Sequence, residues 1–269
     1  MFPETLPPCF ISSDLKRALG GIIRDLDRNY LNRGRSTVYA RYNGTKHDGN
    51  RRPYGTPNPV SYFNTCTFIA KNWSTFSEKY AESSFSVGTP QIASATDDRA
   101  IIVPSLSELS SKVSAKIHYA PYILKTDIAQ FFPSIYSHSI PWAAHGKEQS
   151  KVDQQKDSKS NTFNALDFLV QNVQSMQTRG VLIGPDAYRI IAEFIASDFD
   201  KKLEDRVGDI IVGAVRHVDD FYIGVRSEVD ATVVLSELRN ILQDYELQIN
   251  DTKTRVINGL HPIDDLWAQ

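Results

Sequence analysis

Cysteine is scarce in this chain of 269 residues, which contains only Cys9 and Cys66. Two cysteines make neither a disulfide framework nor a zinc site, which agrees with a reducing compartment. Long apolar runs are also missing, because no uninterrupted stretch approaches the length needed to cross a bilayer. The first residues carry Glu4 and several prolines where a secretory signal needs a basic start and an apolar stretch. We therefore expect a cytoplasmic protein without a membrane partner.

The chain also lacks a strong excess of either charge, since its formal net charge is −2. This balance argues against a surface that grips nucleic acid everywhere. Basic residues nevertheless outnumber the lone acid Asp48 between residues 28 and 54, and tyrosines are interleaved with them. Arginines beside aromatic side chains suit phosphate contacts and base stacking. The segment is either a solvated basic face or a nucleic-acid surface, for which the candidates are Arg41, Arg51 and Arg52.

Apolar spacing and turn residues divide the chain into helices and short strands. We expect helices over 12–32, 63–83, 107–119, 162–176, 186–205 and 230–247, and strands over 99–105, 122–127, 209–218, 221–225 and 254–258. The Gly-, Pro- and Asn-rich residues 43–61 should be loop, and the polar residues 146–161 an exposed or disordered insertion. This order predicts an α+β fold, a sheet with helices on one face. The length is compatible with one large domain or with two packed subdomains.

Two adjacent aspartates, Asp219 and Asp220, stand between two strand-like runs, and Asp127 ends another strand. The pair is compatible with an ordinary hairpin turn, because Asp is a common turn residue. If the three carboxylates meet on neighbouring strands, they repel one another by roughly 4 kcal/mol at an effective dielectric of about 20. Two Mg²⁺ ions, or Mn²⁺, would offset that repulsion and form a two-metal site. Spacing alone leaves both interpretations open.

Four ordered segments resemble the catalytic motifs of reverse transcriptases: LKTDIAQFFPSI, RGVLIGPDAYRIIAEFI, RHVDDFYIG and QINDTKTRVI. Two segments, TDIAQFFPSIYSHSIPWAAHGK and LPPCFISSDLKRAL, are similar to the bacterial abortive-infection and unknown-group reverse transcriptases that defend against phage. The resemblance runs from about residue 6 to about residue 260.

The resemblance implies a right-hand polymerase fold with fingers and an antiparallel palm sheet. It assigns 1–120 mainly to fingers, 121–140 to palm, 141–178 to fingers with the insertion at 146–161, 179–258 to palm, and 259–269 to the start of a thumb or C-terminal region. The thumb is then absent or lies in a further C-terminal region.

Residue by residue, the resemblance makes Asp127 and Asp219 metal ligands and Asp220 the second aspartate of the pair. The backbone carbonyl of Ile128 would complete a metal shell. Phe132 matches the steric gate, a ring that leaves no room for a ribose 2′-hydroxyl and so selects deoxynucleotides. The alternative for Phe132 is a core aromatic beside Phe131.

Further substrate contacts follow from the same motifs. Arg99 matches a fingers arginine for the triphosphate, because a guanidinium forks onto phosphate oxygens. Lys253 matches a lysine near the leaving pyrophosphate. Either residue is also compatible with a solvated surface cation. Gly180 and Gly184 would form the tight turn at the nucleotide's edge.

The resemblance predicts a DNA polymerase that uses deoxynucleoside triphosphates in antiphage defence. Its template is RNA, or it works without one, because Arg179 and His217 replace the Gln and the Tyr common in templated relatives. Expected partners are nucleic acid, a dedicated non-coding RNA, and a second subunit or a second copy of the chain. One alternative is a nucleic-acid-binding scaffold with the same fold and little chemistry, and a weaker one is a metal-dependent nuclease.

Overall fold

The structure is a computed structural model that describes residues 36–45, 49, 51–94, 101, 102, 104 and 106–258. The chain forms two compact units, each built from segments distant in sequence. The first unit takes the described residues of Met1–Phe76, Ile92–Ile101 and Ile135–Ile191. The second takes those of Ser77–Gln91, Ile102–Ser134 and Ala192–Gln269. The helix expected over 12–32 lies outside the described residues.

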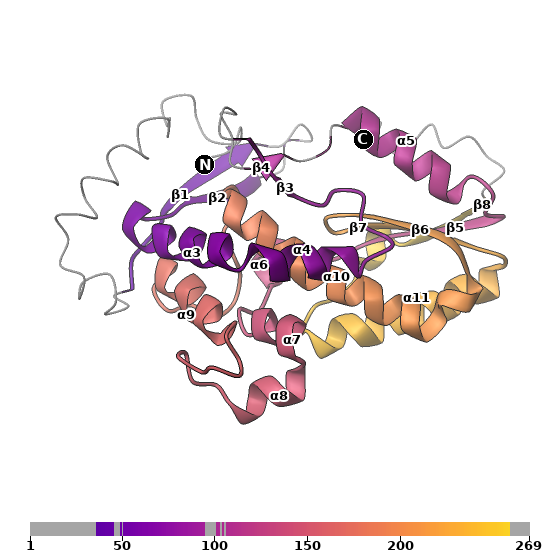
Figure 1. Ribbon diagram of the computed structural model, residues 1–269. Coiled ribbons are helices and arrows are strands. Elements are labelled where there is room, and N and C mark those ends of the chain that lie inside the picture. The colour runs from indigo at the N-terminus through magenta and orange to yellow at the C-terminus, as the bar shows by residue number, and fades with distance from the viewer. Residues whose placement is uncertain are drawn as a thin grey trace. The chain divides into compact units, whose positions relative to one another are not determined.

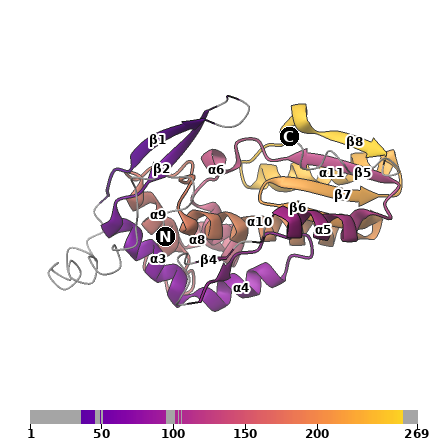
Figure 2. The ribbon, with the colours of Figure 1, turned by 90° about the horizontal axis from the view of Figure 1, so that it is seen from above.

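A four-stranded antiparallel sheet is the centre of the second unit. Its strand order is β6-β7-β5-β8, formed by β5 (Tyr122–Asp127), β6 (Ile211–His217), β7 (Asp220–Val225) and β8 (Arg255–Asn258). Figure 2 shows these strands side by side. All four follow the predicted strands closely, so the sheet expected from the β-rich runs is confirmed.

Helices pack on both faces of this sheet, which corrects the expectation of helices on one face. Helix α5 (Leu106–Ile117) lies against β6 and β7, and α11 (Glu228–Asp244) lies against β5 and β7 on the other side (Figure 1). Every residue of β7 after Asp220 is buried. A strand that is apolar without alternation is typical of burial on both faces, and this was the signal for a second helical layer.

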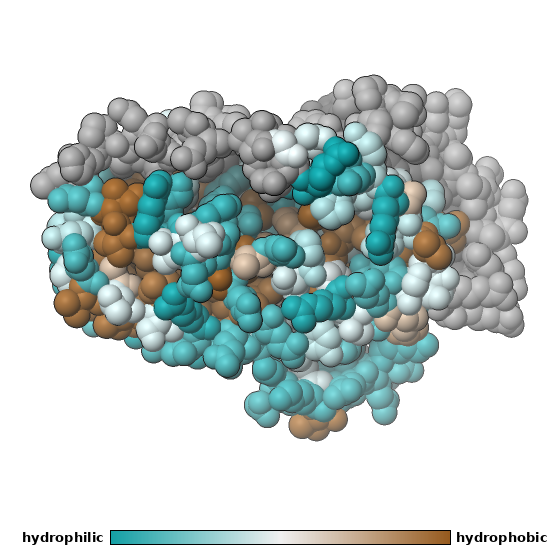
Figure 3. All heavy atoms as spheres, turned by 180° about the vertical axis from the view of Figure 1, so that it is seen from behind, coloured by the Kyte–Doolittle hydropathy of each residue, from teal (hydrophilic) through white to brown (hydrophobic). Residues whose placement is uncertain are grey.

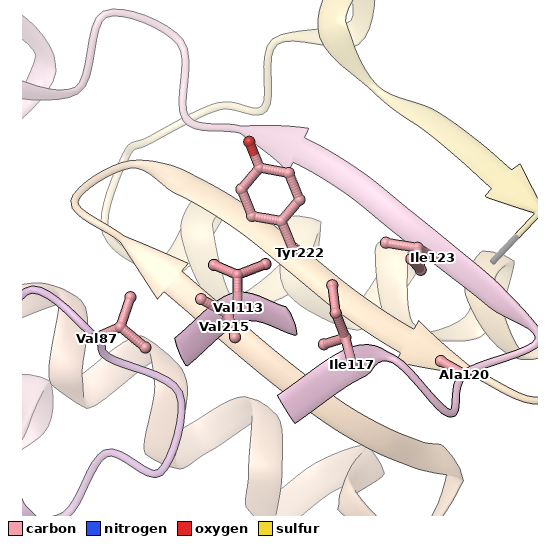
Figure 4. Close-up of a cluster of buried hydrophobic side chains, with 7 residues drawn as sticks. All are labelled: Val87, Val113, Ile117, Ala120, Ile123, Val215 and Tyr222. Carbon is pink, nitrogen blue, oxygen red and sulfur yellow. The ribbon is translucent and has the colours of Figure 1, made fainter. Parts of the chain in front are cut away.

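The contact between α5 and the sheet depends on two glycines. A Cβ atom at Gly213 would lie 2.0 Å from the Lys116 carbonyl oxygen, and one at Gly224 would lie 2.5 Å from the Ala120 Cβ. The backbones can therefore approach closely, and an apolar cluster fills the space beside them. Figure 4 shows this cluster, which consists of Val87, Val113, Ile117, Ala120, Ile123, Val215 and Tyr222.

The long helix α10 (Asp186–Val207) is buried around most of its circumference rather than amphipathic. A helix buried on all sides needs partners for its polar residues. In the second unit, Asp198 accepts ion pairs from Lys79 and Lys202 at 2.7 Å and 2.8 Å. Lys79 comes from α4 (Trp73–Ala81), which follows α3 (Pro59–Lys71) after a break at Asn72. The single helix expected over 63–83 is thus two helices.

The first unit is mainly helical. Helix α3 packs on α9 (Asn164–Val173), which contacts α7 (Ser139–His145), and α7 in turn packs on α8 (Lys147–Val152). Phe163 is a shared core residue, because its ring contacts Phe68 and Phe76 at centroid distances of 5.5 Å each. The short helix α6 (Phe131–Ser134) belongs to the second unit.

The described residues of 43–61 lie mostly in two paired strands and the start of a helix, so the loop expected there is wrong. Strand β1 (Ala40–Thr45) pairs with β2 (Arg51–Thr56), and the rings of Tyr42 and Tyr54 stack across the pair with centroids 6.1 Å apart. Gly44 and Gly55 allow close packing, whereas Gly49, between the strands, has φ 78°. A Cβ at Gly44 would lie 2.5 Å from the Tyr54 ring, and one at Gly55 would lie 2.9 Å from Leu182.

Residues 146–161 are largely exposed, as expected, but they are ordered in the structure. They include α8, and the buried Asn161 side chain donates hydrogen bonds to the carbonyls of Gln149 (3.1 Å) and Asp153 (2.9 Å). One buried amide thus ties together a segment whose composition alone predicts disorder. The strand expected over 99–105 is reduced, among the described residues, to β4 (Ile101–Ile102), which pairs with β3 (Gln91–Ile92).

None of the described helices is long and apolar enough to span a bilayer. On the face drawn in Figure 3, hydrophobic side chains occur in separate groups among hydrophilic ones.

Candidate active site at the end of the four-stranded sheet

The sheet brings together the carboxylates that the sequence singled out. Asp127 is the last residue of β5, Asp220 is the first residue of β7, and the two are register partners across the antiparallel pair. Partners in an antiparallel pair project from the same face. Asp219 precedes Asp220 in the two-residue turn from β6, and its carbonyl accepts a hydrogen bond from the Ile128 amide at 3.1 Å.

The turn that carries Asp219 has an unusual backbone. Val218 has φ 61°, in the left-handed region, whereas Asp219 does not have a positive φ. A positive φ at the first residue of a two-residue hairpin turn is the type II′ pattern, which normally has glycine there. A β-branched residue in this region is strained, by about 1–3 kcal/mol, and persists only where its surroundings hold it.

A buried arginine holds this turn. Arg216, on β6, is fully buried and donates a hydrogen bond from Nη1 to the Val218 carbonyl at 3.0 Å. Its guanidinium also binds Asp200 through Nε at 2.9 Å and 2.8 Å, and Glu193 through Nη2 at 2.7 Å. Ser83 and Ser86 donate to the same two carboxylates at 2.6 Å each. The hairpin is thereby fastened to α10.

Burial and neighbouring carboxylates raise the pKa of two of the three acids, Asp219 and Asp220. Burial raises the pKa of Asp219 from 3.8 to about 6, and the charges of Asp220 and Asp127 add to the rise. Burial and the Asp127 charge likewise raise the pKa of Asp220. The repulsion anticipated from the sequence is therefore present in the fold.

Lys253 supplies part of the compensating charge. It ends the 3₁₀ turn η2 (Asp251–Lys253), and its Nζ lies 2.7 Å from Asp127 Oδ2. This hydrogen bond raises the pKa of Lys253. The other oxygen of Asp127, Oδ1, is buried and has no hydrogen-bond partner.

The donor set suits a hard divalent cation, although the side chains do not form a ready cage. Carboxylate oxygens are the ligands that Mg²⁺ and Mn²⁺ take, and the orphaned Oδ1 of Asp127 is an acceptor without a donor. Over the residues that the structure describes, no group of three or more His, Cys, Asp or Glu side chains is gathered closely enough to hold a metal. In this arrangement Lys253 neutralises Asp127 instead.

Phe132 lies close to the carboxylates in sequence and is not a core residue. It belongs to α6, which starts four residues after Asp127, and its ring is partly exposed. Phe131 is buried and contacts Phe132 edge to face at a centroid distance of 5.8 Å. Phe131 fills the core and leaves Phe132 accessible, which is compatible with a gate.

The remaining expected residues lie elsewhere. Gly180 and Gly184 belong to the first unit and have φ of 86° and 123°, which accounts for glycine at both positions. Arg41, Arg51 and Arg52 lie in the exposed hairpin β1–β2 of the same unit. Arg99 lies outside the described residues.

Sequence reasoning missed several side chains around the carboxylates. Lys125 stands two residues before Asp127 on β5, and its register partners are Tyr222 on β7 and Arg255 on β8. The period of two along a strand was the available signal, because it puts Lys125 and Asp127 on one face. Arg216 was missed as well, since its buried partners come from distant segments.

Comparisons with known proteins match this fold to telomerase. No family model and no curated protein matches the sequence. Apo telomerase from Candida tropicalis, truncated from its C-terminal domain, superposes with a TM-score of 0.54 at 16% identity, over 84% of this chain and 51% of that chain. Telomerase from Candida albicans in complex with a TWJ fragment of telomeric RNA gives 0.53 at 13% identity, over 91% and 47%. The chain spans about half the length of these telomerase chains, and its fold is similar to theirs.

Proposed function

We propose that the chain is a DNA polymerase of the reverse-transcriptase type, with its active site at Asp127, Asp219 and Asp220. The observation that carries the proposal is the register of Asp127 against Asp220, with Asp219 beside them in a turn that Arg216 fastens. The telomerase-like fold and the order of the four motifs support it. Residues 121–140 and 179–258 would then act as the palm, and 1–120 and 141–178 mainly as the fingers.

The reaction is nucleotidyl transfer from a deoxynucleoside triphosphate to a hydroxyl. A bond forms between that hydroxyl oxygen and the α-phosphorus, the hydroxyl loses its proton, and pyrophosphate leaves. When bound, two Mg²⁺ or Mn²⁺ ions would supply Lewis-acid activation of the hydroxyl and of the triphosphate. Asp127, Asp219, Asp220 and the Ile128 carbonyl would hold them. Once freed from its ion pair with Asp127, the Lys253 ammonium would neutralise or protonate the leaving pyrophosphate.

Phe132 and the first unit would bind the rest of the substrates. The accessible Phe132 ring would exclude a 2′-hydroxyl, and Gly180 and Gly184 would allow close approach of the nucleotide. Arg99 would contact the triphosphate. The hairpin β1–β2 presents Arg41, Arg51 and Arg52 beside stacked tyrosines and would contact a template or a dedicated non-coding RNA.

The biological setting is proposed from the motif resemblance. Similarity to abortive-infection reverse transcriptases supports a cytoplasmic role in antiphage defence, with a partner subunit or a second copy of the chain. Synthesis would be templated by RNA or proceed without a template. The alternative is a scaffold of the same fold, and the absence of a closely gathered metal-holding group among the described residues favours it to that extent.

Incorporation of labelled deoxynucleotides tests the proposal. Wild-type protein, purified with and without nuclease treatment, should incorporate label with Mg²⁺, and Asp219→Ala/Asp220→Ala should not. Loss of synthesis after nuclease treatment would show that a bound nucleic acid serves as template or primer. No incorporation by wild type under either condition would favour the scaffold.

A further inference from the structure

Two cationic side chains and a tyrosine form a row across the sheet, two residues away from the carboxylates along β5 and β7. Tyr222, Lys125 and Arg255 are register partners on the adjacent strands β7, β5 and β8, and so share one face. Asp220 and Asp127 lie two residues further along β7 and β5 on that same face. Two residues of a strand correspond to about 6.6 Å.

The two cations of this row lack acidic partners. Lys125 and Arg255 stand directly opposite each other, an arrangement of like charges that destabilises a sheet. Within the described part of the chain, neither forms a salt bridge, and Asp127, two residues after Lys125 on β5, is paired with Lys253. A surface that keeps two unpaired cations side by side suits an anionic ligand.

This row is covered at one end and accessible at the other. Val113 and Ile117 of α5 pack in one cluster with Ile123, Tyr222 and Val215, and Val215 is the register partner of Tyr222 on β6. In Figure 4 the hydroxyl of Tyr222 points away from the other six labelled side chains. Lys125 Nζ lies 5.4 Å from the centroid of the Tyr222 ring, and Arg255 is exposed. Lys125 and Arg255 are therefore the accessible residues of the row, and Tyr222 is the buried one.

We propose that Lys125 and Arg255 bind a phosphodiester of the growing DNA strand, one step back from its reacting 3′ end. The inference deepens the proposed function and rests on it for the identity of the strand. A strand whose 3′ hydroxyl lies at the carboxylates carries its last phosphodiester one nucleotide back, and the row lies at a comparable distance. Phosphates of the incoming nucleotide share this chemistry, but Lys253 is the cation in the carboxylate row itself.

Strand binding without catalysis tests the site. Fluorescence anisotropy would measure the affinity of a labelled single-stranded oligodeoxynucleotide in EDTA over a series of salt concentrations. Lys125→Gln/Arg255→Gln should weaken binding about tenfold, through loss of charge-assisted hydrogen bonds. The slope of log K against log salt should fall in magnitude by about 0.7, because one phosphate contact of a single strand is lost.

Matched variants distinguish the loss of this site from a loss of positive charge elsewhere and from misfolding. Lys201→Gln/Arg206→Gln also removes one lysine and one arginine, from partly exposed pairs on α10, and should leave binding within twofold. The charge-retaining Lys125→Arg/Arg255→Lys should bind like wild type, which shows that the site folds and that charge carries the effect.

Unchanged strand affinity in Lys125→Gln/Arg255→Gln would overturn the inference. If that variant also had a raised KM for deoxynucleotide, the row would be assigned to the nucleotide's phosphates. Because binding is measured without metal or nucleotide, a wild type that binds through this row yet incorporates nothing would contradict the polymerase alone. An active wild type whose double variant binds normally would contradict the strand site alone.

Discussion

At the scale of single residues, the site contains a carboxylate in an unfavourable environment and a strained backbone. Asp219 is partly buried beside two other acids, and Val218 is held with a positive φ. Both features destabilise the free protein. Such unfavourable conformations and environments are concentrated at active sites and ligand-binding sites. The sequence indicated the carboxylates through adjacent aspartates and motif order. It could not show that Arg216 would hold their turn.

Asp219 gives the metal-free protein a defined pH dependence. Its pKa rises from 3.8 to about 6 on folding, mainly through burial, so between these values the folded state holds a proton that the unfolded chain has released. Stability should therefore fall as pH rises from about 4 to about 6. Asp219→Asn should be more stable than wild type at pH 8 by roughly 1–3 kcal/mol, and the difference should vanish near pH 4.

Urea unfolding in EDTA across this pH range would measure that difference. The exposed Asp205→Asn is a matched control that keeps Asp219, so its stability should still fall as pH rises from about 4 to about 6. A gap between wild type and Asp219→Asn that stays constant with pH would contradict the assigned environment of Asp219.

Phe132 is predicted to control sugar selection. Phe132→Ala should raise ribonucleotide incorporation relative to deoxynucleotide by at least tenfold, because the ring no longer fills the space of the 2′-hydroxyl. The ratio of kcat/KM for matched ribo- and deoxynucleotides measures this directly. The neighbouring Phe131→Leu should alter stability and not the ratio, since Phe131 is a core residue. An unaltered ratio in Phe132→Ala would remove the gate.

At the scale of elements, apolar periodicity predicted the sheet and most helices, because their strands and helices bury regular faces. It failed where composition and packing disagree. Gly44 and Gly55 suggested a loop, yet each lies in a strand under a large neighbouring side chain. The polar residues 146–161 suggested disorder, yet the buried Asn161 orders them through backbone hydrogen bonds. Neither contact is visible in local sequence.

The junction of α5 and the sheet should depend on the missing side chain of Gly213. Gly213→Ala would place a Cβ 2.0 Å from the Lys116 carbonyl, so the helix or the strand must move. We expect destabilisation of about 1–3 kcal/mol, as for other overpacked sites. Gly208→Ala is the matched control, because its nearest contact would be an ordinary 3.4 Å. Equal urea midpoints for the two variants would contradict the close approach.

At the scale of the whole chain, segments far apart in sequence meet to support one hairpin. Arg216 joins β6 to Glu193 and Asp200 of α10 and, through these, to Ser83 and Ser86. Such long-range pairing explains why sequence motifs located the carboxylates but not their support. The network also links the site's geometry to the stability of the second unit.

Removing Arg216 should therefore lower the free energy of unfolding much more than removing an exposed arginine. Arg216→Met leaves Glu193 and Asp200 buried without their cation, and we expect a loss of about 3–5 kcal/mol. Arg206→Met breaks a partly exposed pair with Glu237 and should cost less than about 1 kcal/mol. Denaturant unfolding compares the two directly, and a similar small loss for both would show that the buried network does not hold the fold.

The central claim is that Asp127, Asp219 and Asp220 together carry out nucleotide addition. The most direct measurement is Mg²⁺-dependent incorporation of labelled deoxynucleotide by wild type and by Asp127→Asn, which keeps the shape and removes the charge. The exposed Asp251→Asn controls for the loss of an acid nearby in the second unit. We expect synthesis by wild type and by Asp251→Asn, and at least a hundredfold lower incorporation by Asp127→Asn. Equal synthesis by all three would contradict it.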